Sequence, residues 1–210
     1  MTALIFAAAA VTAYLVGSIN PAIILSRTIY RTDVRGFGSH NPGFTNFMRV
    51  FGNHHAWTVF ILDFAKSAIV CGGFGWLFLR TFGLFHLGAA YTSVFALLGH
   101  VYPVWYGFQG GKGVAVMFAA MWFIEWRAAA VILGVFLILI IATRYMSLSV
   151  IFAALTGPIT MCVTGVEHPA VMILTCLGIA LMILRHHENI QRLLKGTESK
   201  FVLKKKDRRE

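Results

Sequence analysis

Charged residues are scarce in this chain, and acidic residues are the scarcest of them. Asp, Glu, Lys and Arg together make up 12% of the 210 residues, whereas hydrophobic residues make up 58%. A soluble domain carries about 25% charged residues, so this composition excludes an ordinary soluble protein. The length leaves room for about seven apolar segments of roughly 20 residues, which is the length of a membrane-crossing helix. We therefore predict an all-α integral membrane protein with about seven transmembrane helices.

Cysteine is also rare. Cys71, Cys162 and Cys176 are far apart in the sequence, and each lies in an apolar segment. This pattern excludes a disulfide framework and predicts three isolated, buried small hydrophobes. Neither His186 nor His187 has a Cys, an Asp or a well-spaced further His nearby, so no metal site is expected there. No Lys or Arg precedes the first apolar segment, and a cleaved secretory signal is therefore not expected either.

Seven apolar segments are separated by polar or glycine-rich turns, and each is predicted to be a helix. They cover residues 2–26, 55–79, 85–101, 114–124, 128–143, 147–163 and 170–184, with a turn at residues 165–169. In the first segment, Asn20-Pro21 predicts a kink, because proline lacks the N–H of a helical hydrogen bond. In the second segment, Asp63 and Lys66 are three residues apart, which predicts a structural ion pair on one helix face.

A glycine-rich loop precedes the fourth apolar segment and is the most informative stretch of the chain. Residues 98–114 read LGHVYPVWYGFQGGKGV, in which four glycines surround one cation, Lys112. Glycines let backbone N–H groups approach an anion closely, and the lysine adds a full positive charge beside them. The helix that follows points its N-terminus into the loop, and a helix N-terminus also attracts anions. The loop therefore predicts a phosphate site that includes Gly110, Gly111 and Gly113.

Two other interpretations of this loop compete with the phosphate site. A nucleotide-triphosphatase P-loop is excluded, because Tyr106 stands where the pattern requires Gly and Gly113 stands where it requires Ser or Thr. A flexible turn between two membrane helices with a lysine at the interface remains open. Such a turn needs only one or two glycines, so the phosphate site is favoured.

A second polar stretch, residues 35–52, reads RGFGSHNPGFTNFMRVFG. Asn41 followed by Pro42 predicts the start of a short helix, on which Asn46 and Arg49 share one face. The glycines together with Ser39, Asn46 and Arg49 favour a second anion-binding surface, whereas an ordinary cytoplasmic loop is the simpler alternative.

A third polar stretch, residues 185–201, reads RHHENIQRLLKGTESKF. If the seventh helix continues through it, His186 and Asn189 lie one turn apart on one face, Glu188 pairs with Arg192, and Gly196 caps the helix. We predict one transmembrane domain over residues 1–195. Residues 196–210 are predicted to be a basic tail that associates with anionic lipid headgroups and is otherwise disordered.

The cations are distributed unevenly between the two ends of the predicted helices. With the N-terminus outside, the inner loops carry most of the Arg and Lys residues, including Lys112 and the whole basic tail, and the outer turns carry only Arg80 and Arg127. Because inner loops are enriched in Lys and Arg, this orientation is predicted, and the C-terminus is cytoplasmic. All three polar stretches then meet at the cytoplasmic face.

The three polar stretches together resemble the PlsY family of bacterial glycerol-3-phosphate acyltransferases. That family has a GSGN-x-GATN segment followed by Arg, and this chain has GSHNPGFTNFMR at residues 38–49. The family motif GH-x-x-P followed by FKGGKGVA matches GHVYP from Gly99 and FQGGKGVA at residues 108–115. The family segment H-x-[ED]-N-I followed by Arg matches HHENIQR from His186. The order and spacing agree, and the resemblance extends over nearly the whole chain.

The resemblance implies a seven-helix protein of the bacterial inner membrane that uses no cofactor and no metal. It implies transfer of a fatty acyl group from acyl phosphate to the 1-hydroxyl of glycerol 3-phosphate, giving lysophosphatidic acid and phosphate, the first acylation step of phospholipid biosynthesis. Neither acyl-CoA nor acyl carrier protein is expected to replace acyl phosphate. His186 is implied as a general base, with the substrate's own phosphate as a rival base. The other implied site residues are Lys112, Ser39, Arg49 and Asn189 for catalysis, and Gly110, Gly111, Gly113, Ser147, Asn46 and Asn41 for substrate binding.

Three positions depart from the family pattern. His40 replaces the second Gly of GSGN, Phe44 replaces the Ala of GATN, and Gln109 replaces the Lys before the Gly-Gly pair. We expect the loss of a cation at position 109 to weaken phosphate binding and Phe44 to narrow the pocket. These changes affect the expected kinetic constants and chain-length preference more than the reaction class.

Alternatives from other classes explain the sequence less well. A transporter for a phosphorylated solute also needs cations and helix breaks, but transporter sites lie near the membrane midplane between repeats, and no internal repeat is visible here. A metal-dependent phosphatidyltransferase needs clustered Asp residues, whereas Asp33 and Asp63 are too few and too far apart. No nucleic-acid partner is indicated, because the basic tail is explained by a membrane surface.

Overall fold

The computed structural model describes residues 1–166 and 168–202, and this part of the chain contains helices and turns without strands. The helices are α1 (Thr2–Gly17), α2 (Pro21–Thr28), α3 (Phe44–Phe51), α4 (Asn53–Phe82), α5 (Phe85–Val101), α6 (Val114–Ile124), α7 (Trp126–Thr143), α8 (Met146–Thr164), α9 (Pro169–Leu184) and α10 (His187–Leu194). Short 3-10 turns occur at Val34–Gly36 and Val104–Tyr106.

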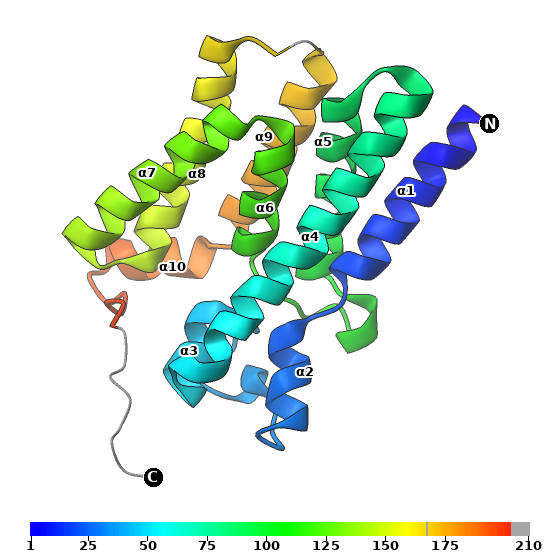
Figure 1. Cartoon of the computed structure of the whole chain (residues 1–210). Helices are drawn as coiled ribbons and strands as arrows, with labels where there is room; N and C mark the ends of the chain where they lie inside the picture. Colours follow the sequence, from blue (N-terminus) through cyan, green and yellow to red (C-terminus); the bar gives the residue numbers. More distant parts are fainter. Residues whose placement is uncertain (167, 203–210) are drawn as a thin grey trace.

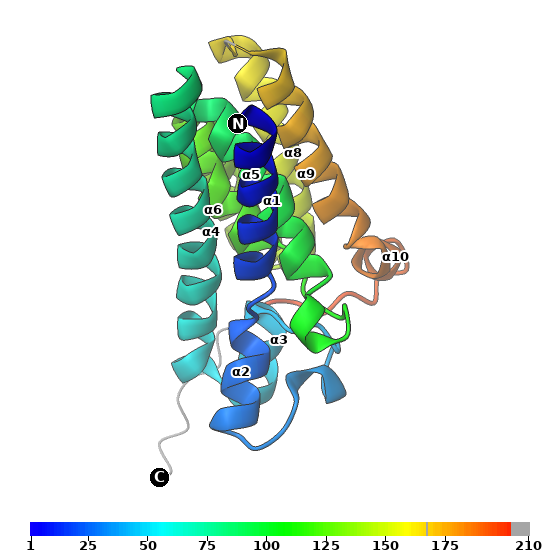
Figure 2. The ribbon, with the colours of Figure 1, turned by 90° about the vertical axis from the view of Figure 1, so that its right-hand side faces the viewer.

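The long helices form one bundle, and the short helices gather at one end of it. Helices α1 and α4–α9 run side by side, α2 and α3 lie beside the lower part of α4, and α10 lies at the lower end of α8 (Figures 1 and 2). We call this end, with the loops of residues 29–43 and 102–113, the polar end. The N-terminus lies at the opposite end (Figure 1). Helix α5 is the centre of the bundle, because it packs against α1, α4, α6 and α9.

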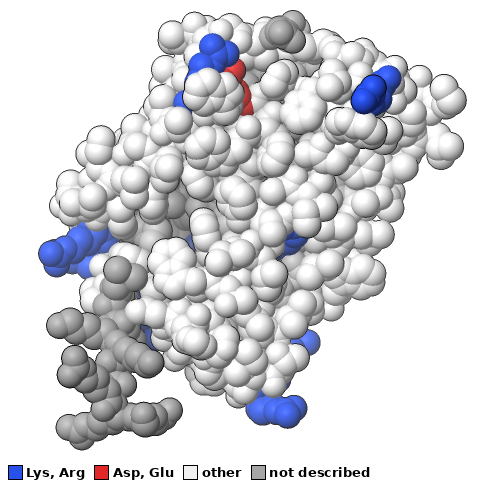
Figure 3. Space-filling view, viewed as in Figure 1, with Lys and Arg blue, Asp and Glu red and all other residues white. Residues whose placement is uncertain are grey.

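The apolar surface of the bundle agrees with a membrane protein. On the face in Figure 3, charged side chains lie mainly toward the two ends, and most of the surface is uncharged. Five described segments are long and apolar enough to cross a membrane, and six if α9 and α10 form one bent span. Helix α6 has 11 residues, a rise of about 16 Å, which is too short for a hydrocarbon core of about 30 Å. The predicted all-α membrane fold is confirmed, and all seven predicted segments are helical, but α6 does not cross alone.

The first two polar stretches fold partly as predicted. The kink at Asn20-Pro21 is confirmed as a break between α1 and α2, where the Asn20 side chain accepts a hydrogen bond from the Ile23 N–H. The predicted helix start at Asn41-Pro42 is wrong, because α3 begins at Phe44 with Gly43 as its N-cap. Gly43 is extended, with a φ of −148° and a ψ of 174°, and the Pro42 carbonyl accepts a hydrogen bond from the Asn20 side-chain amide at 3.2 Å.

The predicted continuation of the seventh helix is also wrong. Helices α9 and α10 are bent by 56° at Arg185 and His186. The His186 N–H bonds to the Ile183 carbonyl at 2.8 Å, which tightens the last turn, and the His186 ring bonds to the Met182 carbonyl. In a continuous α-helix, the Met182 carbonyl would accept a hydrogen bond from the His186 N–H. The His186 ring bonds to this carbonyl instead, and the helix ends here. The predicted pair of Glu188 and Arg192 is present, with a 3.8 Å separation.

Only one cysteine is buried as predicted. Cys71 is buried in α4, whereas Cys162 in α8 and Cys176 in α9 are exposed. The prediction of burial is wrong for these two because their helix faces point out of the bundle, where lipid rather than protein surrounds an apolar side chain. The predicted ion pair between Asp63 and Lys66 is confirmed, at 2.7 Å inside the bundle.

Candidate active site

A cavity of about 650 Å³ lies at the polar end. Helices α3, α4, α7 and α8 contribute to its wall, together with the start of α6, the α9–α10 bend and residues 198–202. Nine of the predicted site residues line it: Ser39, Asn41, Asn46, Arg49, Lys112, Gly113, Ser147, His186 and Asn189. The fold thus brings the three polar stretches to one pocket, although they are far apart in the sequence.

Lys112 is the cation at the N-terminus of α6. Gly113 caps this helix with a φ of +84°, which glycine adopts without strain, and the first amides of α6 have no partner within the helix. The Lys112 ammonium donates a hydrogen bond to the Asn189 side-chain oxygen. Burial, aided by the charge of Arg192, lowers the pKa of Lys112 to about 8. A half-buried cation beside unpartnered helix amides has the chemistry that suits a phosphate group.

Gly110 and Gly111 act differently from the sequence prediction. Their N–H groups donate to the Val101 and His100 carbonyls, at 3.1 and 3.0 Å, and neither residue lines the cavity. These two amides are already used, so they are not free to bind an anion directly. A side chain at Gly111 would collide with His100, because its Cβ would lie 2.2 Å from His100 Nε2. The two glycines therefore let the loop pack closely on the end of α5.

Asn46 shapes the first polar loop. Its side-chain oxygen accepts from the Ser39 N–H at 2.8 Å, and its amide group donates to the Val34 and Phe37 carbonyls, at 3.3 and 3.0 Å. Because Asn46 is buried and its amide is engaged with backbone, it holds the loop that presents Ser39 to the cavity. Arg49 lies one turn further along α3, exposed on the cavity wall and without an ion pair in the described chain.

Arg35 fastens the first polar loop to the glycine loop, a contact that the sequence analysis did not foresee. Its guanidinium donates to the Tyr106 carbonyl at 2.9 Å and to the Gln109 carbonyl at 3.3 Å. Asp33 holds the same guanidinium at 2.9 Å, and hydrogen bonds from Arg35 and then Arg27 keep the pKa of Asp33 well below its ordinary value. The Arg35 contacts thus join the two loops that bring Ser39 and Lys112 to one pocket.

His186 presents a free ring nitrogen. Its Nδ1 lies 2.8 Å from the Met182 carbonyl, which can only accept, so Nδ1 carries the proton and Nε2 keeps its lone pair. Burial lowers the pKa of His186 to about 4, with further lowering from Lys112 and Arg185. The imidazole is therefore neutral at pH 7 and able to accept a proton.

Glu198 is a site residue that the sequence analysis missed, because it lies in the predicted basic tail. Its carboxylate accepts hydrogen bonds from Ser147 at 2.7 Å, Asn189 at 2.6 Å and Arg192 at 2.7 Å. Burial alone would raise its pKa, but these three hydrogen bonds outweigh burial and hold the pKa below the ordinary value. The carboxylate thus joins α8 to α10 behind Lys112. Only residues 203–210 of the predicted tail lie outside the described residues.

A profile for a family described as glycerol-3-phosphate acyltransferase matches residues 7–196. The chain belongs to the glycerol-3-phosphate acyltransferase family. It is 38% identical over 199 residues to the glycerol-3-phosphate acyltransferase of Actinobacillus succinogenes, covering 94% of each protein. It is 40% identical over 198 residues to that of Proteus mirabilis, covering 92% of this chain and 86% of the relative.

Solved structures of this family have the same fold. The crystal structure of PlsY (YgiH), an integral membrane glycerol 3-phosphate acyltransferase in its glycerol 3-phosphate form, is 33% identical and superposes with a TM-score of 0.85. Its lysophosphatidic acid form is 32% identical, with a TM-score of 0.82. In both comparisons the match covers 94% of this chain and 96% of the other. This protein is therefore a multi-pass membrane member of the acyltransferase family.

The three departures from the acyltransferase pattern have structural explanations. His40 has a φ of +57°, a conformation that suits the usual glycine, and its ring bonds to the Arg35 carbonyl at 2.8 Å. Phe44 packs on Trp57 and Phe60, with ring centroids 5.0 and 5.8 Å apart. Gln109 is exposed and is not among the residues that line the cavity.

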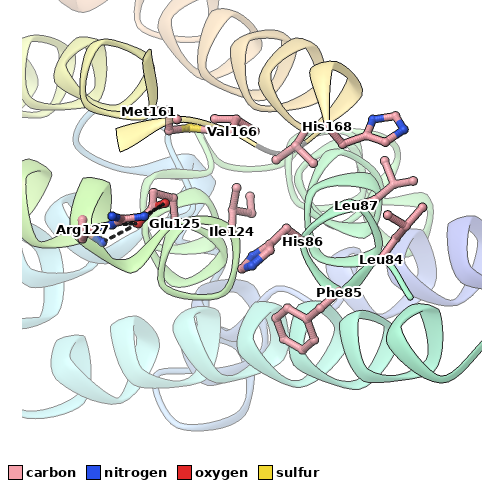
Figure 4. A pocket seen from close by; sticks show the side chains of 12 residues that line it. Leu84, Phe85, His86, Leu87, Ile124, Glu125, Arg127, Met161, Val166 and His168 are labelled. Carbon is pink, nitrogen blue, oxygen red and sulfur yellow. Dashed lines mark hydrogen bonds and ion pairs between the residues drawn. The ribbon is translucent and has the colours of Figure 1, made fainter. Parts of the chain in front are cut away.

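A second cavity, of about 100 Å³, lies at the opposite end (Figure 4). The ends of α6 and α8 and the starts of α5, α7 and α9 surround it. Glu125 and Arg127 form an ion pair of 2.9 Å at its wall, and His86 faces the same space. The cavity is too small for two phosphorylated substrates.

Glu167 of the predicted turn lies outside the described residues. Among the described residues, no group of three His, Cys, Asp or Glu side chains could hold a metal ion.

Proposed function

We propose that this protein transfers a fatty acyl group from acyl phosphate to the 1-hydroxyl of glycerol 3-phosphate, which gives lysophosphatidic acid and inorganic phosphate. The reaction is the first acylation step of phospholipid biosynthesis. Family membership supports the acceptor, since solved members are described in glycerol 3-phosphate and lysophosphatidic acid forms. The observation that carries the proposal is the composition of the cavity, which joins a cationic wall to an apolar wall.

The cationic wall suits two phosphate groups. Lys112, Ser39 and Arg49 line the cavity together with the N-terminus of α6, and they can neutralise and orient both substrates. Asn41 and Gly113 line the same space, whereas Gly110, Gly111 and Asn46 shape the loops around it. Ser147 and Asn189 also belong to the polar part of the lining, and both donate hydrogen bonds to Glu198.

The apolar wall suits the acyl chain of the donor. Phe44, Trp57 and Phe60 of α3 and α4 line the cavity, as do Phe136 and Ile140 of α7. Such a wall lets a lipid-soluble chain lie between helices while its phosphate reaches the cations. An acyl phosphate brings only a small anionic group to this pocket. Acyl-CoA would add a bulky nucleotide, so acyl phosphate is the favoured donor.

The chemical step needs a base and no enzyme nucleophile. The 1-hydroxyl oxygen attacks the acyl carbon, the bond from that carbon to the phosphate oxygen breaks, and the phosphate leaves with the bonding electron pair. His186 Nε2 accepts the hydroxyl proton, with the substrate phosphate as the alternative acceptor. Lys112 and Arg49 stabilise the charge on the leaving phosphate.

The charge distribution supports an orientation with the N-terminus outside the cell membrane and the site at the cytoplasmic face. The polar end carries Arg27, Arg35, Arg49 and Lys112, whereas the opposite end carries Arg80 and Arg127. Lys and Arg favour the cytoplasmic side of the inner membrane. Glycerol 3-phosphate then enters from water, and the donor enters from the lipid.

The test is a product assay on the protein in lipid vesicles. Labelled glycerol 3-phosphate is supplied with palmitoyl phosphate or with palmitoyl-CoA, without metal or nucleotide. We expect labelled lysophosphatidate with palmitoyl phosphate only, and near-complete loss of product in folded Lys112→Ala. Equal product with palmitoyl-CoA would contradict the proposal that acyl phosphate is the donor. No product from either donor, together with uptake of labelled glycerol 3-phosphate, would instead identify a transporter.

A further inference from the structure

Three ionisable side chains form a buried cluster inside the helix bundle, beneath the glycine loop. Asp63 and Lys66 lie in α4 and His100 in α5, with 3%, 8% and 4% of their surfaces exposed. Charges in a membrane helix are expensive to bury, and those that persist serve a structural or functional purpose. The step described above uses none of the three.

Lys66 determines which nitrogen of His100 carries the proton. The ammonium contacts Asp63 Oδ1 at 2.7 Å, the Ile19 carbonyl at 2.6 Å and His100 Nδ1 at 3.0 Å. Asp63 Oδ1 also lies near Nδ1, but at 3.4 Å it is further away than the ammonium. An ammonium has three donors and no acceptor, so we assign Nδ1 as the acceptor of this shorter contact. Neutral histidine then carries its proton on Nε2. The cluster therefore fixes His100 as an Nε2–H donor.

The Nε2–H group of His100 lies at the glycine loop. A Cβ on Gly111 would come within 2.2 Å of Nε2, so only the bare Gly111 backbone lets the ring reach this position. His100 and Lys112 both line the cavity. Within the described chain, Nε2 has no hydrogen-bond partner, although the side chain is almost completely buried. An oriented donor without a partner, on a cavity that Lys112 also lines, suits an anionic ligand.

We propose that His100 is a second histidine of the site and donates its Nε2–H to an oxygen of a phosphate group held at Lys112. Asp63 and Lys66 are positioning residues, since they act through His100. The proposal rests on the proposed function for the identity of the ligand, which is the phosphate of glycerol 3-phosphate or of the acyl donor. It also explains why the glycine loop packs so closely on the end of α5.

The test compares two substitutions of His100 that separate the role of Nδ1 as an acceptor from the role of Nε2 as a donor. His100→Asn keeps an acceptor for Lys66 but has no group at the Nε2 position, whereas His100→Gln places an amide N–H near that position. His86→Asn, at the other end of the same helix, is the matched control. Ligand dissociation constants are measured from the thermal stabilisation of the protein in lipid nanodiscs by inorganic phosphate and by glycerol 3-phosphate. The KM of each substrate is measured in parallel.

We expect His100→Asn to weaken phosphate binding at least about tenfold, as the loss of a hydrogen bond to a charged group implies. His100→Gln should recover most of this loss, and His86→Asn should bind as the wild type does. A rise in the KM of only one substrate identifies whose phosphate His100 contacts. Unchanged binding and unchanged KM values in folded His100→Asn would overturn the proposal.

A ¹⁵N NMR spectrum of the wild-type protein keeps the proposal testable if the His100 variants do not fold. With ¹⁵N-labelled histidine, the His100 ring should carry its proton on Nε2, and this signal should move when phosphate is added. A proton on Nδ1, or an Nε2 signal that phosphate does not move, would contradict the proposal. Both binding tests use phosphate directly, so they report on His100 even if the wild type proves to have no acyltransferase activity.

Discussion

In the proposed reaction, binding of the phosphate depends on the charge of Lys112, and that charge is sensitive to pH. Burial lowers the pKa of Lys112 in the free protein to about 8, so the ammonium is present below this pH and is lost above it. We expect kcat/KM for glycerol 3-phosphate to fall as the pH rises through about 8, because kcat/KM reports the free enzyme. The kcat profile should keep its plateau to higher pH, since bound phosphate stabilises the charged lysine.

The control for this prediction is Lys112→Arg, because the guanidinium stays charged throughout this range. Its kcat/KM, although lower, should lack the fall above pH 8. The same alkaline fall in both proteins would mean that another group titrates and that the Lys112 charge is not responsible.

His186 offers a neutral ring nitrogen to the attacking hydroxyl, and its removal should slow the chemical step. We expect His186→Ala to lower kcat by about 10²–10⁴-fold, the usual contribution of a general base. Binding of glycerol 3-phosphate, measured by thermal stabilisation, should change little. A binding defect with unchanged kcat would instead make His186 a ligand contact. The adjacent, exposed His187 provides the matched control, His187→Ala.

Individual site residues could be predicted from the sequence where a motif names them, but their contacts could not. Lys112, Ser39 and His186 reach the cavity as predicted. Glu198 was missed because its three partners come from α8 and α10, and nothing local marks it. His100 stands in the GH-x-x-P motif, yet its proton position depends on Lys66 in another helix.

The contact between the first polar loop and the glycine loop is an element-scale feature with a testable consequence. Arg35 makes charge-assisted hydrogen bonds to two carbonyls of the glycine loop, and such bonds contribute about 1.5–3 kcal/mol. Arg35→Ala should therefore raise the KM of both substrates and lower the apparent Tm by several degrees. Arg80→Ala, at the other end of the bundle, should change neither. Wild-type KM values in Arg35→Ala would show that the loops hold their positions without this clamp.

Helix boundaries could be predicted well where glycine, proline or charge marks them. The predicted segments 85–101 and 114–124 agree with α5 and α6 to the residue. The bend between α9 and α10 was missed because no proline or glycine stands there, and a histidine ring bonded to a carbonyl ends the helix instead. The start of α3 was misplaced because a distant residue, Asn20, holds the Pro42 carbonyl.

At the scale of the whole molecule, the asymmetry of charge predicts how the bundle lies in the membrane. A cysteine at Thr2 should react with a membrane-impermeant maleimide in intact cells, whereas a cysteine at Lys195 should react only after the membrane is opened. The background protein should lack Cys162 and Cys176, because both are exposed. Opened cells, in which both positions react, provide the control. Labelling of Lys195→Cys in intact cells would contradict the proposed orientation.

The fold makes one pocket from three stretches, and we propose that two phosphate-bearing substrates meet there and that one attacks the other directly. A covalent acyl-enzyme would instead release phosphate from the donor before any acceptor arrived. The most direct measurement is therefore the release of inorganic phosphate from palmitoyl phosphate, followed in the first turnover with and without glycerol 3-phosphate. The account predicts no phosphate without the acceptor and one phosphate per lysophosphatidate with it. A burst of one phosphate per protein molecule in the absence of glycerol 3-phosphate would contradict it.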